Sequence, residues 1–241
     1  MHVATLRTDL LFGANRHVVA EARSLDVDLS PAETIHGLIN PREGLLLYVL
    51  ARRAAQLGDI VEIGAYLGRS TWYLARGLED GGSPHRLISI DPHLVDGQEE
   101  SYRDALRRTG IADRVDVRVG YSHEQVASVA AGLGMLWIDG DHEYAAARRD
   151  FDEWFPLLAD GGWFAMHDAV AGWPGTVQLA RELVAGRDDL DDVGIVWLTL
   201  FGRKAAPGTV SRARRVRRRA AHELVARAQQ LRARMRDRRR S

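Results

Sequence analysis

Residues 61–71 read VEIGAYLGRST, a short apolar run that enters a glycine-containing turn and then a helix opening at Ser70–Thr71. Glycine lets the backbone turn tightly and approach a ligand closely, and the first turn of a helix offers unpaired N–H groups. The glycines at 64 and 68 have the spacing G-x-x-x-G, not the dinucleotide-binding G-x-G-x-x-G, and no lysine follows as in a phosphate-binding loop. This stretch therefore predicts a strand–turn–helix unit whose turn can bind a ligand without a pyrophosphate clamp.

The rest of the chain alternates short apolar runs with segments whose apolar residues recur at helical spacing. This alternation predicts a parallel sheet covered by helices on both faces. Right-handed crossovers then make the fold class α/β, a doubly wound and mostly parallel sheet with a basic C-terminal helical tail. The predicted strands are residues 59–64, 85–91, 114–120, 135–139, 163–168 and 193–204, the last being one strand or a pair, and the predicted helices are 43–57, 68–81, 97–111, 122–134, 143–162 and 176–186.

The composition is that of one globular domain. The chain has 241 residues with 46% hydrophobic content, which is enough for a single substantial core. It contains no cysteine, which excludes disulfides, thiolate metal sites and a cysteine nucleophile. The sequence shows neither a long apolar span nor a secretory signal, so we expect a cytoplasmic protein. We expect an N-terminal helical segment at 1–40, a ligand-binding domain at 41–204 and an arginine-rich, helical or disordered tail at 205–241.

Charge is unevenly distributed along the chain although the net charge is zero. Residues 203–241 hold 15 basic and two acidic residues, whereas residues 1–202 hold 18 basic and 31 acidic residues. Apolar residues recur every three or four positions from Val216 to Met235, which predicts a helix with a thin apolar stripe among arginines. Such a tail is compatible with an anionic membrane surface as partner, with nucleic acid as partner, or with a solvated and partly disordered extension.

Polar, titratable residues follow the predicted strands at the point where each strand ends. Ligand sites of doubly wound sheets lie beyond these carboxyl ends, so we expect the residues to share one site. Asp91 is suited to accept hydrogen bonds from a ribose diol, and Glu62 to hold a cationic ligand group. The full set is Glu62, Asp91, Ser122, the run from Asp139 to His142, His167 and Asp168.

These features resemble the class I S-adenosylmethionine-dependent methyltransferases, whose first motif has the form E-x-G-x-x-x-G found at 62–68. The resemblance covers residues 35–204 and implies that the ligand-binding domain takes S-adenosylmethionine as its cofactor. It also implies that the glycine turn cups the methionine part, that Asp91 binds the ribose and that Ser122 lies on the adenine side. The cofactor-binding residues so implied are Glu62, Gly64, Gly68, Ser70, Thr71, Asp91, Ser122 and Asp139.

The stretches IDGDHEY, at 138–144, and MHDAV, at 166–170, are similar more narrowly to the metal-dependent O-methyltransferases. The group in closest agreement contains the macrocin-type sugar O-methyltransferases and the cephalosporin-hydroxylase-like proteins. Oxygen ligands suit Mg²⁺, and a histidine ligand makes Mn²⁺ a candidate as well. The resemblance implies a divalent-metal site with the ligands Asp139, Asp168 and His167, and a general base at His142.

The chemistry of a hydroxyl acceptor agrees with this resemblance. An unassisted hydroxyl has a pKa of about 15.7, so methyl transfer to its oxygen needs a metal or a base such as His142. We therefore predict a metal-assisted O-methyltransferase that acts on a small hydroxylated acceptor. The resemblance to the macrocin-type group implies a saccharide or a glycosylated natural product as the acceptor class. The alternatives are an RNA methyltransferase anchored by the basic tail and a non-catalytic methyltransferase-fold binding module. The sequence leaves the acceptor open, together with the question of a homo-oligomer.

Overall fold

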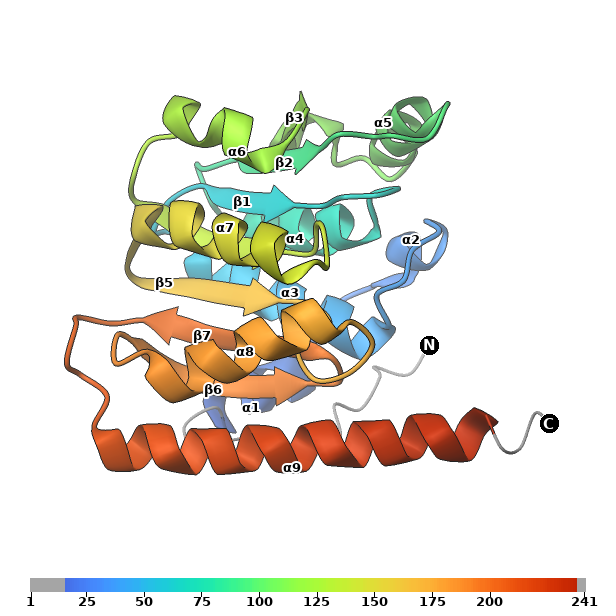
Figure 1. The fold of residues 1–241 in the computed structure, drawn as a ribbon. Coiled ribbons are helices and arrows are strands. Elements are labelled where there is room, and N and C mark those ends of the chain that lie inside the picture. Colours follow the sequence, from blue (N-terminus) through green and yellow to red (C-terminus); the bar gives the residue numbers. More distant parts are fainter. Residues whose placement is uncertain (1–15, 238–241) are drawn as a thin grey trace.

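The computed structural model describes residues 16–237, which form a sheet with helices on both faces (Figure 1). The start of the predicted 1–40 segment and the last residues of the predicted tail lie outside the described residues. In chain order the elements are α1 (Arg16–Ser24), α2 (Ser30–Glu33), α3 (Pro41–Ala54), β1 (Ile60–Ile63), α4 (Arg69–Asp80), β2 (Leu87–Asp91), α5 (Gln98–Arg108), η1 (Ala112–Arg114), β3 (Val115–Val119), α6 (Ser122–Gln125), η2 (Val126–Ser128), β4 (Leu133–Ile138), α7 (Tyr144–Trp154), η3 (Phe155–Leu157), β5 (Leu158–Met166), α8 (Pro174–Gly186), β6 (Leu190–Val196), β7 (Thr199–Lys204) and α9 (Arg212–Asp237).

The seven strands lie in the order β3-β2-β1-β4-β5-β7-β6. The first five are parallel, whereas β7 runs antiparallel to both β5 and β6, so the predicted strand at 193–204 is a hairpin. The strand order reverses between β1 and β4, and this is where open α/β sheets leave a crevice for ligands. The predicted doubly wound, mostly parallel fold is confirmed.

Successive residues of each strand point to opposite faces of the sheet, and each face has its own hydrophobic core. Ile60 and Met135 belong to the core covered by α1, α3, α4 and α5. Val61 and Leu136, one position further along the same strands, belong to the core covered by α7, α8 and α9. Figure 1 shows α7 and α8 in front of the sheet, with α3 and α4 behind it. Because both faces are covered, the site-bearing edge is the one where the parallel strands end.

The helix α3 begins two residues earlier than the predicted 43–57 because its first turn is capped. The Asn40 side chain accepts hydrogen bonds from the N–H groups of Arg42 and Glu43, and Glu43 reaches back to the N–H of Asn40. Pro41 occupies the first helical position, where a missing N–H costs nothing. This capping box fixes the position of Glu43, which bears on the site below.

Two predicted helices are shorter in the structure. The helix predicted at 143–162 ends at Trp154, and β5 begins at Leu158, because Pro156 restricts the preceding residue and cannot donate a helical hydrogen bond. The helix predicted at 122–134 is reduced to α6 and a single 3₁₀ turn. No residue between 120 and 132 is fully buried, and only Val126 and Val129 pack partly against the core, which is little apolar contact to stabilise a longer helix.

The described part of the arginine-rich tail is one long helix, α9, which contacts α8 and lies along the β6 side of the sheet (Figure 1). Its buried residues Val225 and Ala226 belong to the same core as α7 and α8. The α1 helix likewise packs on α3, while the domain boundaries at 40 and 204 stay predictions. Within residues 16–237, no helix has both the length and the apolar character needed to cross a membrane.

Candidate active site

A cavity of about 920 Å³ opens where β1, β2, β4 and β5 end. This volume lies in the range of cofactor and small-molecule sites. The structure brings most of the predicted site residues to its wall: Gly64, Ser70, Asp91, Ser122, Asp139, His142, His167 and Asp168. Three predicted residues, Glu62, Gly68 and Thr71, are not among the described residues that line the cavity. These three lie close behind the wall and shape it from there.

The turn after β1 requires glycine for a steric reason. Gly64 has φ +86°, and a Cβ atom there would lie 2.1 Å from the carbonyl oxygen of Asp139. Gly68, which precedes α4, has φ +95°, and Tyr66 between them also has a positive φ of 50°. L-residues with a side chain rarely adopt such angles. Gly64 therefore lets the turn approach the strand end that carries Asp139, and Gly68 lets it pass close to the ring of Tyr102.

The Asp91 carboxylate, at the end of β2, fastens this turn. Its Oδ2 accepts hydrogen bonds from the N–H groups of Ala65 and Tyr66, each at 2.8 Å, and its Oδ1 accepts one from the N–H of His93 at 2.7 Å. A carboxylate offers about four acceptor positions, so capacity for a further donor is left. Asp91 lines the cavity, and its predicted contact with a ribose stays a prediction.

Glu62 is fully buried behind the turn. Its Oε2 accepts hydrogen bonds from the hydroxyls of Thr71 and Ser89, both at 2.7 Å, and Ser89 in turn accepts one from Tyr102 at 2.8 Å. Burial is the main reason why the pKa of Glu62 is raised to about 7. This network ties β1 to α4, β2 and α5. The placement of Glu62 and Thr71 favours support of the turn, and their predicted contacts with a cofactor stay predictions.

Ser122, at the start of α6, lines the cavity and donates a hydrogen bond to Asp150 on α7. Asp150 is buried, and burial is the main reason why its pKa is raised to about 6. The hydrogen atom of the Ser122 hydroxyl is therefore already engaged by Asp150, which also lines the cavity. Its predicted place on the adenine side is compatible with this geometry, which leaves the lone pairs of the hydroxyl oxygen as acceptors.

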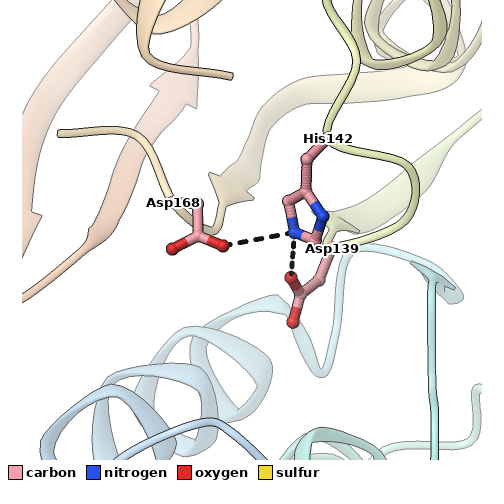
Figure 2. Close-up of side chains that lie close together, drawn as sticks. All are labelled: Asp139, His142 and Asp168. Carbon is pink, nitrogen blue, oxygen red and sulfur yellow. Dashed lines mark ion pairs between the residues drawn. The ribbon is translucent and has the colours of Figure 1, made fainter. Parts of the chain in front are cut away.

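The carboxyl ends of β4 and β5 bring Asp139, His142 and Asp168 together (Figure 2). The Nε2 atom of His142 lies 3.2 Å from Oδ2 of Asp168 and 3.7 Å from Oδ1 of Asp139. The His142 ring is stacked on Trp173, with 4.8 Å between ring centroids and 11° between planes. His142 thus stands at the cavity wall with one edge toward two carboxylates and one face against a half-exposed indole.

His167 lies deeper, at the end of β5, and is almost fully buried. Its Nδ1 atom lies 3.2 Å from Oδ1 of Asp139 and 3.4 Å from Oδ2 of Asp168. Its Nε2 atom lies 3.3 Å from Oε1 of Glu43, which is itself 1% exposed. His167 is therefore surrounded by three carboxylates, one of which comes from the N-terminal part of the chain.

These contacts shift the pKa values of the charged groups in opposite directions. The pKa of His142 is raised to about 9, first by its interaction with Asp139 and then by Asp168. Burial opposes a charge on His167, but Asp139, Asp168 and Glu43 outweigh it and raise the pKa of His167 as well. Burial alone would raise the pKa of Asp168, yet the two histidines lower it to about 2. The imidazolium groups thus balance the carboxylates of the site.

The chemistry of the donor atoms fits a divalent cation. Asp139, His142 and Asp168 each offer one ligand atom, and these three atoms lie within 4.8 Å of one another. Two carboxylate oxygens and one imidazole nitrogen are ligands that Mg²⁺ or Mn²⁺ accepts. The structure groups His142 with the two aspartates here, where the sequence pointed to His167, whose far nitrogen faces Glu43. The ligand role of His167 and the base role of His142 stay predictions.

Comparison with known proteins agrees with this geometry. A family model described as a methyltransferase domain matches residues 61–169, which include the glycine turn and the ends of β4 and β5. The catechol O-methyltransferase of Mycobacterium tuberculosis is 31% identical over 156 residues, covering 64% of each chain. The catechol O-methyltransferase of Niastella koreensis is 28% identical over 170 residues, covering 68% of this chain and 70% of that protein.

Solved structures share the fold. The O-methyltransferase TomG of Streptomyces achromogenes, in complex with S-adenosylmethionine, has a TM-score of 0.56 at 22% identity, covering 83% of this chain and 93% of that one. An O-methyltransferase from Bacillus cereus, in complex with S-adenosylhomocysteine, has a TM-score of 0.57 at 19% identity, covering 81% and 93%.

Residues 61–169 match a methyltransferase domain, and this match agrees with the predicted class I S-adenosylmethionine-dependent methyltransferases. The predicted family is thereby confirmed at the level of this class, and the macrocin-type subgroup stays a prediction. The alignment with the Mycobacterium tuberculosis methyltransferase spans 64% of that relative, which is just under two thirds of its length.

Two residues of the site escaped sequence reasoning. Glu43 reaches His167 from α3, and Asp150 holds Ser122 from α7. The residues NPRE at 40–43 form a recognisable capping box, which predicts that Glu43 begins a helix, but nothing in the pattern connects that helix with the end of β5. Asp150 is an acidic residue on a helix rich in charge, and only its burial distinguishes it.

Proposed function

We propose that this chain transfers the methyl group of S-adenosylmethionine to a hydroxyl oxygen of a small acceptor. The observation that carries the proposal is the position of His142, whose imidazole faces two carboxylates at the wall of a cofactor-sized cavity. Support comes from relatives named as O-methyltransferases and from fold neighbours in complex with S-adenosylmethionine or S-adenosylhomocysteine.

The chain's own residues would divide the work between two ends of the cavity. The backbone of the glycine turn and Ser70 would hold the methionine end of the cofactor. The Asp91 carboxylate would accept hydrogen bonds from the ribose hydroxyls. Only the neutral imidazole accepts a proton, and the raised pKa of about 9 makes this the minor form of His142 near pH 7. In that form His142 would take the proton that the acceptor hydroxyl loses as its oxygen attacks the methyl carbon. S-adenosylmethionine would supply the methyl group from its positively charged sulfur. The bond between this sulfur and the methyl carbon would break, and the neutral thioether S-adenosylhomocysteine would leave.

Asp139 and Asp168 would hold a divalent cation, Mg²⁺ or Mn²⁺, with His142 or His167 beside it. When bound, such a cation would neutralise the two carboxylates and act as a Lewis acid toward the acceptor hydroxyl. His167 would keep the two aspartates in place from behind, because its ring contacts both of them and Glu43. The acidic pair would thus be preorganised by buried groups before any ligand enters.

The acceptor would present a ring to Trp173. This indole is half-exposed, lines the cavity and lies parallel to the His142 ring, so a flat acceptor beside it would place a hydroxyl near His142. Leu38 and Leu94, which are largely exposed, add apolar surface to the same wall. The relatives named for catechol favour an aromatic diol. A saccharide or glycosylated natural product is the second acceptor class, since sugar faces also stack on aromatic rings.

Calorimetric titration tests the cofactor and the metal. We expect S-adenosylmethionine to bind the purified chain and Mg²⁺ to give a separate signal, which disappears in Asp139→Ala and Asp168→Ala. Asp113→Ala, in the exposed turn before β3, is the matched control and should keep both signals. If both site variants retain full methyl transfer in the presence of a chelator, the metal role is wrong. No cofactor binding in any condition would end the proposal.

Release of S-adenosylhomocysteine from a panel of catechols and simple glycosides tests the acceptor. We expect Trp173→Ala to raise the KM for a ring acceptor while leaving the affinity for S-adenosylmethionine unchanged. An unchanged KM would remove Trp173 from the acceptor site. The matches to O-methyltransferases favour this reaction over RNA methylation or a non-catalytic module, and the panel separates them, because only a small-molecule enzyme turns over without RNA.

A further inference from the structure

The helix α9 is fixed to the protein through one of its faces. The Arg218 guanidinium is buried, donates to the carbonyl of Leu190 on the edge strand β6 and contacts Asp191 at 3.1 Å. His222, also buried, lies with Nε2 3.0 Å from the carbonyl oxygen of Ala169. Because Ala169 follows Asp168 directly, α9 is tied to the strand end that carries the site. The rotation of the helix about its axis is therefore set by buried contacts.

The opposite face of α9 carries an apolar stripe that stays in water. Val216, Leu224 and Leu231 are 61%, 60% and 59% exposed. At 100° per residue, spacings of eight and seven residues keep all three side chains on one side of a helix. This side is opposite to Arg218 and His222, so α9 is apolar on two faces, and the protein's own core covers only one. We call Val216, Leu224 and Leu231, with the exposed Ala220 and Ala228 between them, the outer stripe.

Arginines without an acidic partner border the outer stripe. Arg214, Arg215 and Arg218 pair with Asp188 and Asp191 of the body, and Arg219 pairs with Glu223. Within the part of the chain that the structure describes, no ion pair is formed by Arg212, Arg217 and Arg227, and all three are exposed. Over its whole length α9 contains ten arginines and two acidic residues. The exposed side of α9 thus combines apolar side chains with uncompensated positive charge.

We propose that the outer stripe of α9 docks on an anionic lipid surface. Such a surface offers what this face requires, namely an acyl boundary for Leu224 and Leu231 and negative charge for the arginines beside them. The rest of the protein would not compete for that surface, since residues 1–202 carry 31 acidic and 18 basic residues. The anionic surface would thereby orient the protein with α9 against it. This binding does not depend on the proposed methyl transfer.

Two other occupants fit the outer stripe less well. Nucleic acid would neutralise the arginines, but phosphates offer nothing to a row of exposed valine and leucine side chains. A second copy of α9 would cover the apolar stripe. It would also bring two arginine-rich helices together, with few acidic residues to neutralise their repulsion. Only the lipid surface complements both the apolar and the charged component of this face.

Vesicle flotation with the full-length chain tests the proposal. We expect binding to vesicles of phosphatidylcholine with phosphatidylglycerol, little binding to phosphatidylcholine alone, and weaker binding as salt is raised. Leu224→Asp should lower the partition coefficient about 10- to 100-fold, since a leucine side chain loses its burial. Leu57→Asp, at another exposed leucine, is the matched control and should bind like the parent chain.

The charge component is tested in the same assay. Arg217→Gln with Arg227→Gln should lower binding about 25-fold, at about fivefold for each arginine. Arg86→Gln, which changes an exposed arginine before β2, should have no effect. None of the changed side chains is buried, so we expect every variant to fold. Circular dichroism and thermal unfolding check this.

Three outcomes would overturn the proposal. The first is binding that depends on the arginines but not on Leu224, which would be adsorption of a basic helix without use of the stripe. The second is tight binding to an RNA oligonucleotide with no binding to vesicles, which would make nucleic acid the partner. The third is a dimer that Leu224→Asp dissociates, again without vesicle binding, which would make a second copy the occupant.

Discussion

Glu43 Oε1, in the first turn of α3, lies 3.3 Å from His167 Nε2 at the end of β5. The same oxygen accepts hydrogen bonds from the N–H of Leu198 and the hydroxyl of Thr199, at 3.1 and 2.9 Å. One buried carboxylate thus joins α3, the histidine behind the aspartate pair and the turn between β6 and β7. The site is held from behind by a residue that never reaches the cavity wall.

Removal of Glu43 should weaken the whole fold. Glu43→Ala removes one of the three carboxylates around His167 and leaves the N–H of Leu198 and the hydroxyl of Thr199 without this acceptor, so we expect the free energy of unfolding to fall by about 3–5 kcal/mol. Glu43→Gln keeps the shape and should cost less. Glu33→Ala, an exposed acid on α2, is the control and should stay within about 0.5 kcal/mol of the parent chain. Urea unfolding measures all three, and equal losses for Glu43→Ala and Glu33→Ala would refute the linking role.

Gly64→Ala should be far more damaging than its chemistry suggests. The added Cβ would lie 2.1 Å from the carbonyl oxygen of Asp139, and the backbone there has φ +86°. Gly97→Ala separates the two effects, because Gly97 has φ +75° but no atom within 4 Å of the added Cβ. We expect a loss of about 1–2 kcal/mol at Gly97 from the strained φ alone. At Gly64 the loss should be larger, together with loss of S-adenosylmethionine binding, and similar losses at both positions would contradict the close approach.

Glu62 should make stability decrease as the pH rises. Its pKa is about 7 in the folded protein, against 4.5 for the ordinary group, so folding takes up a proton between these values. The favourable contribution is fully present below a pH of about 4.5 and is lost as the pH rises through about 7, by about 3 kcal/mol at most. Asp91 and Tyr102 are the neighbouring titratable groups, and the Asp91 charge also favours the protonated form.

Glu62→Gln should remove this pH dependence, because an amide does not titrate. Comparing the free energy of unfolding of the parent chain and of Glu62→Gln at several pH values between about 4.5 and 8 measures the effect. The two curves should converge at the acidic end and separate toward neutral pH, where Glu62→Gln is the more stable form. Parallel curves would mean that Glu62 is not the group responsible.

His142→Ala should abolish turnover while leaving cofactor binding intact. Loss of a general base typically lowers kcat by about 10²- to 10⁴-fold. S-adenosylmethionine affinity should hold, since the glycine turn and Asp91 are untouched. His85→Ala, at a histidine paired with Asp59 and remote from the cavity, is the control for kcat. A normal kcat in His142→Ala would mean that another group, not His142, acts as the general base.

Much of this fold could be predicted from local pattern. The strands that begin near Ile60 and Leu87 are mostly apolar, with Glu62 and Ser89 as their inner polar residues, so their burial on both faces follows largely from composition. Helix lengths were predicted less well. The segment after Ser122 has a helical pattern but only partial burial, and Pro156 ends α7 early. Tertiary packing, not periodicity, decides whether such a segment stays helical.

It could also be predicted which polar residues share the site. Parallel strands end at the same edge of a sheet, so the polar residues that follow them lie close together there. Asp91, Asp139, His142 and Asp168 all reach the cavity wall. Their partners could not be predicted. Which carboxylate faces His167, and whether Glu62 faces a ligand or the core, depends on contacts between segments far apart in the chain.

The sequence by itself determined the α/β class, the glycine turn, the family and the acidic residues at the strand ends, because each of these follows from short-range pattern. Tertiary structure alone decided that Glu43 stands behind the site, that Glu62 is buried and that α9 turns Leu224 outward. These features depend on which surfaces pack together. Which surfaces pack together depends on burial and charge summed over the whole chain. A single stretch of sequence therefore cannot predict it.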